Sequence, residues 1–206
     1  MYIKNIEKIQ QIKPGFRRAS LLLGKNMIML FEAKKGVLLD KHKHRHLQFG
    51  YCFSGTFDFN VNNFVKKVKN DESYLINGNV FHSAIACTDY YSVDIKVLKD
   101  NFNSDIEDIS YNIMKLLKSS SEYDVNFFEF DVYKIYQIKT KKNNVSISLD
   151  FWRNREGFLF VNENVYINFD EQKILLEKMK IYSVKDIDCK ILKIISNNTV
   201  LFLIDL

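Results

Sequence analysis

Short runs of β-branched and aromatic residues recur along the whole chain, and polar turns separate them. In residues 56–61 (TFDFNV), Phe57, Phe59 and Val61 alternate with polar side chains, which indicates a strand with one buried face. Comparable runs occur in both halves, for example at residues 90–98. Many short strands at regular spacing are typical of a sandwich or a barrel, so the sequence predicts an all-β fold.

Two segments depart from this pattern and favour helices. Residues 3–12 (IKNIEKIQQI) predict a short helix near the N-terminus. Residues 104–120 (SDIEDISYNIMKLLKSS) are the better candidate, because Ser104 and Glu107 have the spacing of a capping box. The apolar positions of this segment share one helical face: Ile106, Ile109, Ile113, Leu116 and Leu117. We expect this helix to connect two β units.

The length of the chain allows two small domains. It has 206 residues, of which 47% are hydrophobic, an ordinary share for a protein with a sizeable core. Because the predicted helix lies between two strand-rich halves, we divide the chain into a first domain of residues 1–100, a helical linker of residues 101–124 and a second domain of residues 125–206.

Charge and cysteine content exclude several classes of protein. The net charge is only +5 and the lysines are scattered, so we expect no nucleic-acid partner. No apolar run reaches the length of a signal peptide or a membrane span. The 3 cysteines are far apart and form no C-x-x-C pair, which indicates a reduced, cytoplasmic protein. The abundance of Lys, Asn, Ile and Phe indicates an AT-rich bacterial genome.

Three of the 4 histidines lie side by side in residues 41–46 (KHKHRH). In a strand, His42 and His44 would project from one face, about 6–7 Å apart along the strand. With donors from another strand they would make a metal site; alternatively, the segment is a solvated basic strand. His82 follows a second strand–turn–strand stretch of the same half, and it shifts the balance towards a metal site.

The histidine spacing also matches a known motif. Its pattern is G-x5-H-x-H-x3-(E/Q)-x6-G, and every fixed position is present: Gly36, His42, His44, Gln48 and Gly55. This segment resembles the first motif of the cupin superfamily. The resemblance implies a double-stranded β-helix, which is the jelly-roll fold of cupins.

The second cupin motif is preserved only in part. Its pattern is G-x5-P-x-G-x2-H-x3-N, and His82 matches the histidine. The other fixed positions hold different residues, namely Asp71, Asn77, Asn79 and Ala86. The Asn-Gly-Asn turn at residues 77–79 still provides residues that tolerate a positive φ, as a tight turn before the histidine requires.

The resemblance implies four metal ligands, which are His42, His44, Gln48 and His82. The expected cofactor is a divalent transition metal: Fe, Mn, Ni, Co, Zn or Cu. Most cupins have Glu where this chain has Gln48, and Gln is a neutral and weaker ligand. Bicupins that resemble the bacilysin-pathway isomerase also use His-x-His-x3-Gln-x-Gly. From the sequence alone, replacing Gln48 by Glu should therefore hold the metal more tightly.

The second half of the chain resembles a cupin barrel without a metal site. Gly50 and Gly157 begin similar strands, GYCFSG and GFLFVN. The same shift places residues of other types opposite the four ligands, namely Leu149, Phe151, Arg155 and Cys189. We therefore expect a bicupin whose C-terminal barrel binds no metal. The alternative is one cupin domain followed by an unrelated β-rich domain.

Further residues have candidate roles beside the metal. Cupin strands usually turn after the second histidine, so the resemblance places His46 at the pocket rim or on the surface; the alternative is that His46 joins the metal ligands. His46 and Tyr51 are the candidate acid or base. Arg17 and Arg18 either reach an anionic substrate or are solvated surface cations. Cys52 is either a pocket thiol or a small core residue.

The predicted function follows from the implied metal. A divalent metal would act as a Lewis acid on a small-molecule substrate, which favours an isomerase or another proton-transfer enzyme. Two alternatives stay open: an Fe-dependent dioxygenase, and a non-catalytic cupin that binds a sugar or another metabolite. The resemblance also implies a homodimer, and we expect no membrane partner.

Overall fold

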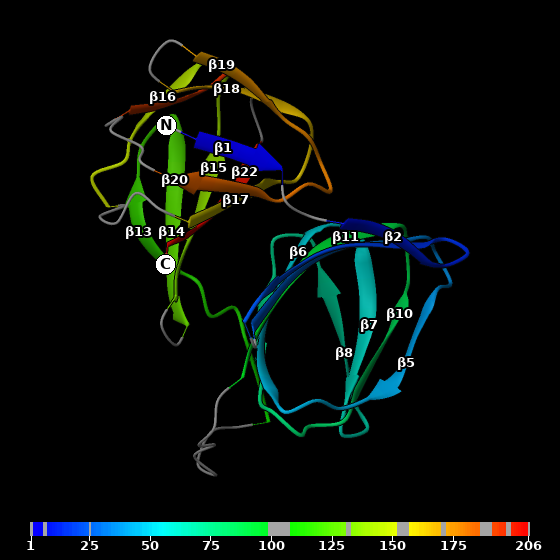
Figure 1. The fold of residues 1–206 in the computed structure, drawn as a ribbon. Coiled ribbons are helices and arrows are strands. Elements are labelled where there is room, and N and C mark those ends of the chain that lie inside the picture. The colour runs from blue at the N-terminus through cyan, green and yellow to red at the C-terminus, as the bar shows by residue number, and fades with distance from the viewer. Residues whose placement is uncertain are drawn as a thin grey trace. The chain divides into compact units, whose positions relative to one another are not determined.

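The computed structural model describes residues 2–5, 8–24, 26–98, 108–130, 133–151, 157–169, 172–185, 191–196 and 199–205. Within these ranges the regular structure consists of 22 strands (Figure 1), so the predicted all-β fold is confirmed. The described residues include no helix that could span a membrane. The strands form two compact units: Lys8–Ile113, and Met114–Leu206 together with Met1–Glu7.

The first unit is built from two antiparallel sheets. The seven-stranded sheet has the order β12 (Ile109–Tyr111), β9 (Ser73–Ile76), β6 (His46–Ser54), β11 (Tyr90–Leu98), β4 (Asn26–Ala33), β3 (Phe16–Leu23) and β2 (Lys8–Lys13). The four-stranded sheet has the order β5 (Leu38–His42), β10 (His82–Ala86), β7 (Thr56–Val61) and β8 (Phe64–Lys69). Apolar side chains from both sheets form one core cluster.

The alternation expected in residues 56–61 is present in β7. Phe57, Phe59 and Val61 are buried, and the residues between them are partly exposed. In β11 both faces are buried. The face towards the interior of the unit carries the polar residues Ser92 and Asp94, and the opposite face carries apolar side chains. Polar residues that face inward from a central strand are unusual in a hydrophobic core. Here they mark the part of the interior that apolar side chains do not fill.

Two turns of the cupin-like motifs have the backbone that the sequence suggested. Asn79 has a φ of 64°, and its N–H donates to the carbonyl oxygen of His44 at 2.7 Å. Gly55 has a φ of 81°, and a Cβ there would lie 2.0 Å from the carbonyl oxygen of Asp89. A side chain at position 55 would therefore clash with backbone, which explains the glycine at the end of the first motif.

The second unit repeats the sheet order of the first. Its seven-stranded sheet runs β1 (Tyr2–Asn5), β20 (Tyr182–Lys185), β17 (Gly157–Val161), β22 (Val200–Asp205), β15 (Tyr133–Thr140), β14 (Tyr123–Phe130) and β13 (Lys115–Ser119). Its four-stranded sheet runs β16 (Val145–Ser148), β21 (Ile191–Ile194), β18 (Val165–Phe169) and β19 (Gln172–Leu176). β3 and β4 are related to β14 and β15 by the shift that relates Gly50 to Gly157. The two halves are therefore two copies of one jelly-roll plan.

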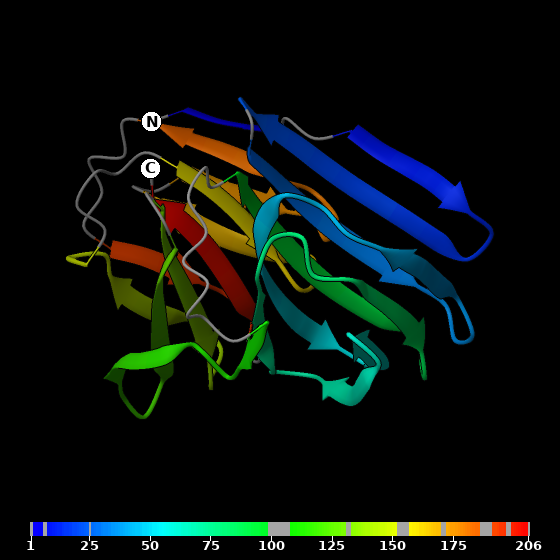
Figure 2. The same cartoon turned by 90° about the horizontal axis from the view of Figure 1, so that it is seen from below.

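The two units take one edge strand of the seven-stranded sheet from different places in the chain. In the first unit β12 follows β11 and pairs with β9. In the second unit β1 pairs with β20 (Figures 1 and 2). The register joins Tyr2 to Lys185 and Asn5 to Tyr182. The helix predicted over residues 3–12 is therefore wrong: its described residues lie in β1 and β2, because the edges of β20 and β3 accept their backbone hydrogen bonds.

The helical linker is also wrong for the described residues. Residues 109–111 form β12 and residues 115–119 form β13, while Ser104 and Glu107 of the proposed capping box lie outside the described residues. Leu116 and Leu117 are 62% and 50% exposed, so the expected apolar face is not buried. Pairing with β9 and β14 satisfies the backbone of both strands, and this tertiary pairing overrides the local helical pattern. The border between the units falls after Ile113.

Candidate metal centre

Three histidines converge in the first unit. His42 ends β5 and His82 begins β10, and the two residues are direct cross-strand partners. His44 lies in the segment that leads from β5 to β6. One ligand nitrogen of each histidine lies within 4.8 Å of the other two. In the described part of the chain, this is the one group of at least three His, Cys, Asp or Glu side chains placed to hold a metal ion.

A backbone carbonyl oxygen lies within hydrogen-bond distance of Nδ1 of each imidazole. The distances from Nδ1 to a carbonyl oxygen are 2.8 Å, 3.0 Å and 2.9 Å, for His42 with Asp40, His44 with His46 and His82 with Val80. A carbonyl oxygen can only accept a hydrogen bond, so Nδ1 of His42 and Nδ1 of His82 carry the proton of the neutral ring. The Nε2 atoms of these two histidines therefore present a lone pair, as metal ligation requires. His44 has an oxygen within hydrogen-bond distance of both ring nitrogens.

Burial keeps two of these imidazoles neutral. It lowers the pKa of His44 to about 3 and the pKa of His82 to about 4. The Nε2 atom of His82 is buried and has no hydrogen-bond partner. An unpaired buried polar atom destabilises a fold by about 1–3 kcal/mol, and a bound cation would remove that penalty. The site therefore fits a metal ion.

Gln48 reaches the histidine cluster from β6. It is 3% exposed, and its Oε1 lies 2.8 Å from Nε2 of His44. The Asp94 carboxylate on β11 lies beside this amide, and a hydrogen bond with the amide opposes the rise in the pKa of Asp94. A neutral His44 ring can donate from only one of its two nitrogens, so one of its contacts with an oxygen lacks a proton, and a cation bound by Nε2 and Oε1 would satisfy that contact. Three imidazole nitrogens and one amide oxygen suit a divalent transition metal.

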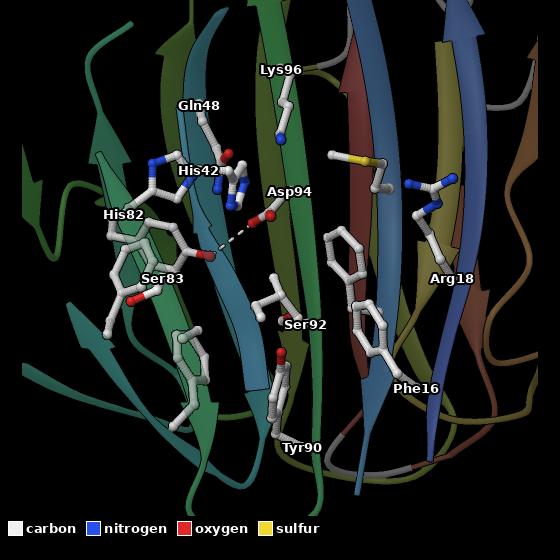
Figure 3. Close-up of a pocket in the computed structure, with 17 residues that line it drawn as sticks. Phe16, Arg18, His42, Gln48, His82, Ser83, Tyr90, Ser92, Asp94 and Lys96 are labelled. Atoms are coloured by element: carbon white, nitrogen blue, oxygen red, sulfur yellow. Dashed lines mark hydrogen bonds between the residues drawn. The ribbon is translucent and has the colours of Figure 1, made fainter. Parts of the chain in front are cut away.

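Two charged residues of β11, Asp94 and Lys96, lie next to Gln48 of β6 (Figure 3). Asp94 is 6% exposed and accepts a hydrogen bond of 2.7 Å from the hydroxyl of Tyr74. Burial raises the pKa of Asp94 to about 6, although Lys96 and its two hydrogen-bond donors oppose this shift. Burial also lowers the pKa of Lys96, and the Asp94 carboxylate opposes that change. Lys96 is the direct cross-strand partner of Gln48.

His42, Gln48 and His82 open onto a cavity of about 200 Å³ between the two sheets of the first unit. Aromatic side chains form much of its wall: Phe16, Phe31, Phe57, Phe59, Tyr74 and Tyr90. Arg18 enters from β3, on the other side of the cavity from Gln48 (Figure 3). Its guanidinium donates to Gln10 at 3.0 Å, and its buried Nε has no partner. The cavity therefore combines an apolar wall with two cations, Arg18 and Lys96.

The cavity includes residues that the sequence reasoning missed. Tyr90, Ser92, Asp94 and Lys96 occupy alternate positions of β11 and share the inner face. Polar residues at alternate positions of an otherwise apolar strand were the available signal. Of the two alternatives that the sequence left open for Arg18, the structure favours the pocket, because Arg18 lies two residues after the buried Phe16 and shares its face.

Other candidate residues lie away from the cavity. His46 begins β6, and its ring centroid is 5.9 Å from that of His44, outside the histidine cluster. Tyr51 is buried and donates to Asp71 at 2.8 Å, so its hydroxyl is engaged elsewhere. Cys52 belongs to the core cluster, where burial raises the pKa of its thiol to about 12. Arg17 forms an ion pair with Glu32 at the surface.

The equivalent region of the second unit has apolar side chains. Leu149 is 4% exposed and belongs to the core of that unit, and Phe151 packs against the same core. Arg155 and Cys189, which the sequence alignment placed opposite Gln48 and His82, lie outside the described residues. At the two positions that can be compared, hydrophobic packing takes the place of the histidines.

The sequence has no match among protein-family models, and no curated protein matches it. Solved structures do match. AerE from Microcystis aeruginosa is 16% identical with a TM-score of 0.68, and the alignment covers 97% of this chain and 96% of AerE. GK1651 from Geobacillus kaustophilus is 13% identical with a TM-score of 0.71, over 98% of this chain and 93% of that chain.

A third match is oxalate decarboxylase from Bacillus subtilis, which is described with Mn(II) centres. It is 8% identical with a TM-score of 0.61, and the alignment covers 98% of this chain and 76% of the enzyme. At such low sequence identities, these matches are evidence for the fold alone. The alignments span both units of the chain, and each unit has the same jelly-roll sheet order. These matches support a two-barrel jelly-roll fold for this chain, which is the fold that the sequence resemblance to cupins implied.

Proposed function

We propose that this chain is a metal-dependent enzyme that acts on a small molecule in the cavity of its first unit. The observation that carries the proposal is the convergence of His42, His44 and His82, whose ligand nitrogens lie within 4.8 Å of one another beside that cavity. Gln48 would complete the ligand set. A divalent metal held there would supply Lewis-acid chemistry to a substrate carbonyl or enolate. Isomerisation, or a related proton transfer, is the reaction type that we favour.

The charges around the cavity favour an anionic substrate. Arg18 and Lys96 are cations on its wall, whereas Asp94 is the acidic residue that lines it. The Asp94 carboxylate already accepts hydrogen bonds from Tyr74 and Gln48, so a substrate anion would meet cations that are not fully neutralised. The aromatic wall suits an apolar part of the same molecule.

Lys96 is our candidate for proton exchange with the substrate. Its side chain lines the cavity beside Gln48, and burial lowers its pKa while the Asp94 carboxylate opposes that shift. His46 and Tyr51, the candidates from the sequence, do not line the cavity. A homodimer and a cytoplasmic location are also proposed, from the cupin resemblance and the cysteine pattern respectively.

Elemental analysis of the untagged protein tests the metal. We expect close to one transition-metal ion per chain in the wild type and almost none in the His42→Ala/His44→Ala variant. His46→Ala is the matched control, because it removes a neighbouring imidazole that lies outside the cluster, and its metal content should equal that of the wild type. Unchanged metal in the double variant would refute the site. A metabolite screen with the metal found then separates an enzyme from a binding protein.

A further inference from the structure

Three residues form a row across the inner face of the seven-stranded sheet. Tyr74 on β9, Gly50 on β6 and Asp94 on β11 are successive cross-strand partners. A Cβ on Gly50 would lie 2.0 Å from Cζ of Tyr74 and 2.4 Å from its hydroxyl oxygen. The absence of a side chain at position 50 therefore lets the Tyr74 ring lie over β6, where its hydroxyl donates to Asp94 at 2.7 Å.

Asp94 sits one row from Gln48 and binds its amide. The cross-strand partner of Asp94 is Gly50, and Gln48 lies two residues earlier on the same strand and face. An ionised carboxylate can only accept hydrogen bonds, so it takes the NH2 end of the amide. The oxygen end must then point the other way, and it does, 2.8 Å from Nε2 of His44. A reversed amide would set its oxygen against the carboxylate and its NH2 group against the histidines.

We propose that Asp94 is the positioning residue that turns the Gln48 oxygen towards the metal, and that it makes Gln rather than Glu the residue suited to position 48. This inference rests on the proposed metal site. Tyr74 and Gly50 belong to the same arrangement, because the hydroxyl that crosses over Gly50 holds the carboxylate from the side opposite the amide. Gln48 and Gly50 are thus needed together. Gln48 provides the ligand oxygen, and Gly50 leaves room for Tyr74, which holds Asp94 in place.

A glutamate at position 48 would meet Asp94 without a proton between them. Both carboxylates are acceptors, and Asp94 is 6% exposed, so their repulsion would be poorly screened by water. Either the pair would take up a proton or the new side chain would turn away from Asp94. The expectation from the sequence alone, that Glu at this position tightens metal binding, therefore reverses as long as Asp94 is present.

A double-mutant cycle tests the coupling. The four proteins are the wild type, Asp94→Asn, Gln48→Glu and the Gln48→Glu/Asp94→Asn variant, all full-length and freed of metal. Cobalt(II) is titrated into each, and binding is followed by calorimetry and by the visible absorption of the bound ion. Ser92→Ala is the matched control, because Ser92 lies two residues before Asp94 on the same inner face of β11.

The expected sign of the Asp94→Asn effect depends on position 48. With Gln48, the loss of a charge-assisted hydrogen bond should weaken cobalt binding about fivefold. With Glu at position 48, the Asn amide can donate to the new carboxylate, and binding should strengthen at least about tenfold. The control Ser92→Ala should show no such dependence on position 48. If Asp94→Asn changes affinity by the same factor in both backgrounds, the two sites are independent and the inference is wrong.

Thermal unfolding of the same four metal-free proteins gives a second readout. Gln48→Glu should lower the midpoint, and adding Asp94→Asn should recover most of the loss, because the acid pair is then replaced by an acid and an amide. A loss that is not recovered would refute the selection of Gln over Glu. A wild type that binds no cobalt would refute the proposed function and the orienting role with it, whereas normal cobalt binding with an additive cycle refutes this inference alone.

Discussion

The two units of this chain share one plan and differ in what fills it. Both have a seven-stranded and a four-stranded sheet with the same strand order. In the first unit, histidines, Gln48, Asp94 and two cations face an internal cavity. In the second unit, the position equivalent to His42 is Leu149, and the position equivalent to Arg18 is Val125, and both side chains are buried in the core. The jelly roll therefore does not need the polar site in order to form.

This difference shows what the first unit gives up. Buried polar groups are costly unless they are hydrogen-bonded, and two atoms of the site, His82 Nε2 and Arg18 Nε, have no partner. An apolar core at the same positions carries no such penalty. We infer that the first unit accepts lower stability to keep a binding cavity, and that the second supplies a packed, chemically silent copy of the fold.

Side-chain truncation at equivalent positions of the two units should show the largest difference, measured as the loss in the free energy of unfolding. Leu149→Ala leaves a void in a packed core, so the free energy of unfolding should fall by about 2–5 kcal/mol. His42→Ala in the metal-free protein should cost about 1 kcal/mol or less, because the imidazole is half-buried and borders a cavity. Urea unfolding of the metal-free variants measures both values, with the exposed Leu116→Ala as control. Equal losses at the two positions would contradict the comparison.

The response to pH should identify the first unit as the sensitive one. The half-buried His44 has a pKa of about 3 and the buried His82 a pKa of about 4, against about 6.5 in an unfolded chain. Between pH 6.5 and 4 the unfolded state binds protons that the folded state does not, so stability falls as the pH falls through this window. Asp94, whose pKa is raised to about 6, acts in the opposite direction. The net loss in the metal-free protein should be about 1–3 kcal/mol.

Unfolding of the metal-free protein by urea at pH 7 and pH 5 measures that loss. In His44→Gln/His82→Gln the two groups responsible are gone, so the remaining pH dependence should be smaller or reversed in sign because Asp94 remains. The same loss between pH 7 and pH 5 in the variant and the wild type would show that these imidazoles do not carry the effect.

Metal binding should show no contribution from the second unit. Leu149 and Phe151 offer no ligand atoms, so excess nickel should leave the content at one ion per chain after gel filtration. The His42→Ala/His44→Ala variant treated in the same way should hold close to none. A second equivalent in the wild type, or density for nickel next to Cys189 in a soaked crystal, would mean that the C-terminal barrel has a site after all.

Much of the fold was readable from the sequence because strand patterns are local. The alternation in residues 56–61 and the shift between the halves predicted strands and a two-barrel plan, and both are found. Local patterns failed at the described residues of segments 3–12 and 104–120, where apolar spacing also fits a helix. Whether such a segment becomes a strand depends on an open sheet edge nearby, here those of β20, β3, β9 and β14, and that is not written in the segment itself.

The site divides in the same way. The sequence by itself determined which residue types are offered as ligands, because the spacing of His42, His44, Gln48 and His82 is a property of the chain. Only the tertiary structure decided what surrounds them. Arg18, Asp94 and Lys96 reach the cavity through the pairing of β3, β4, β11 and β6, and Asp94 turns the Gln48 amide because the register sets it beside Gly50. Hydrogen-bond direction and charge depend on cross-strand neighbours, and those neighbours exist only once the sheets have formed.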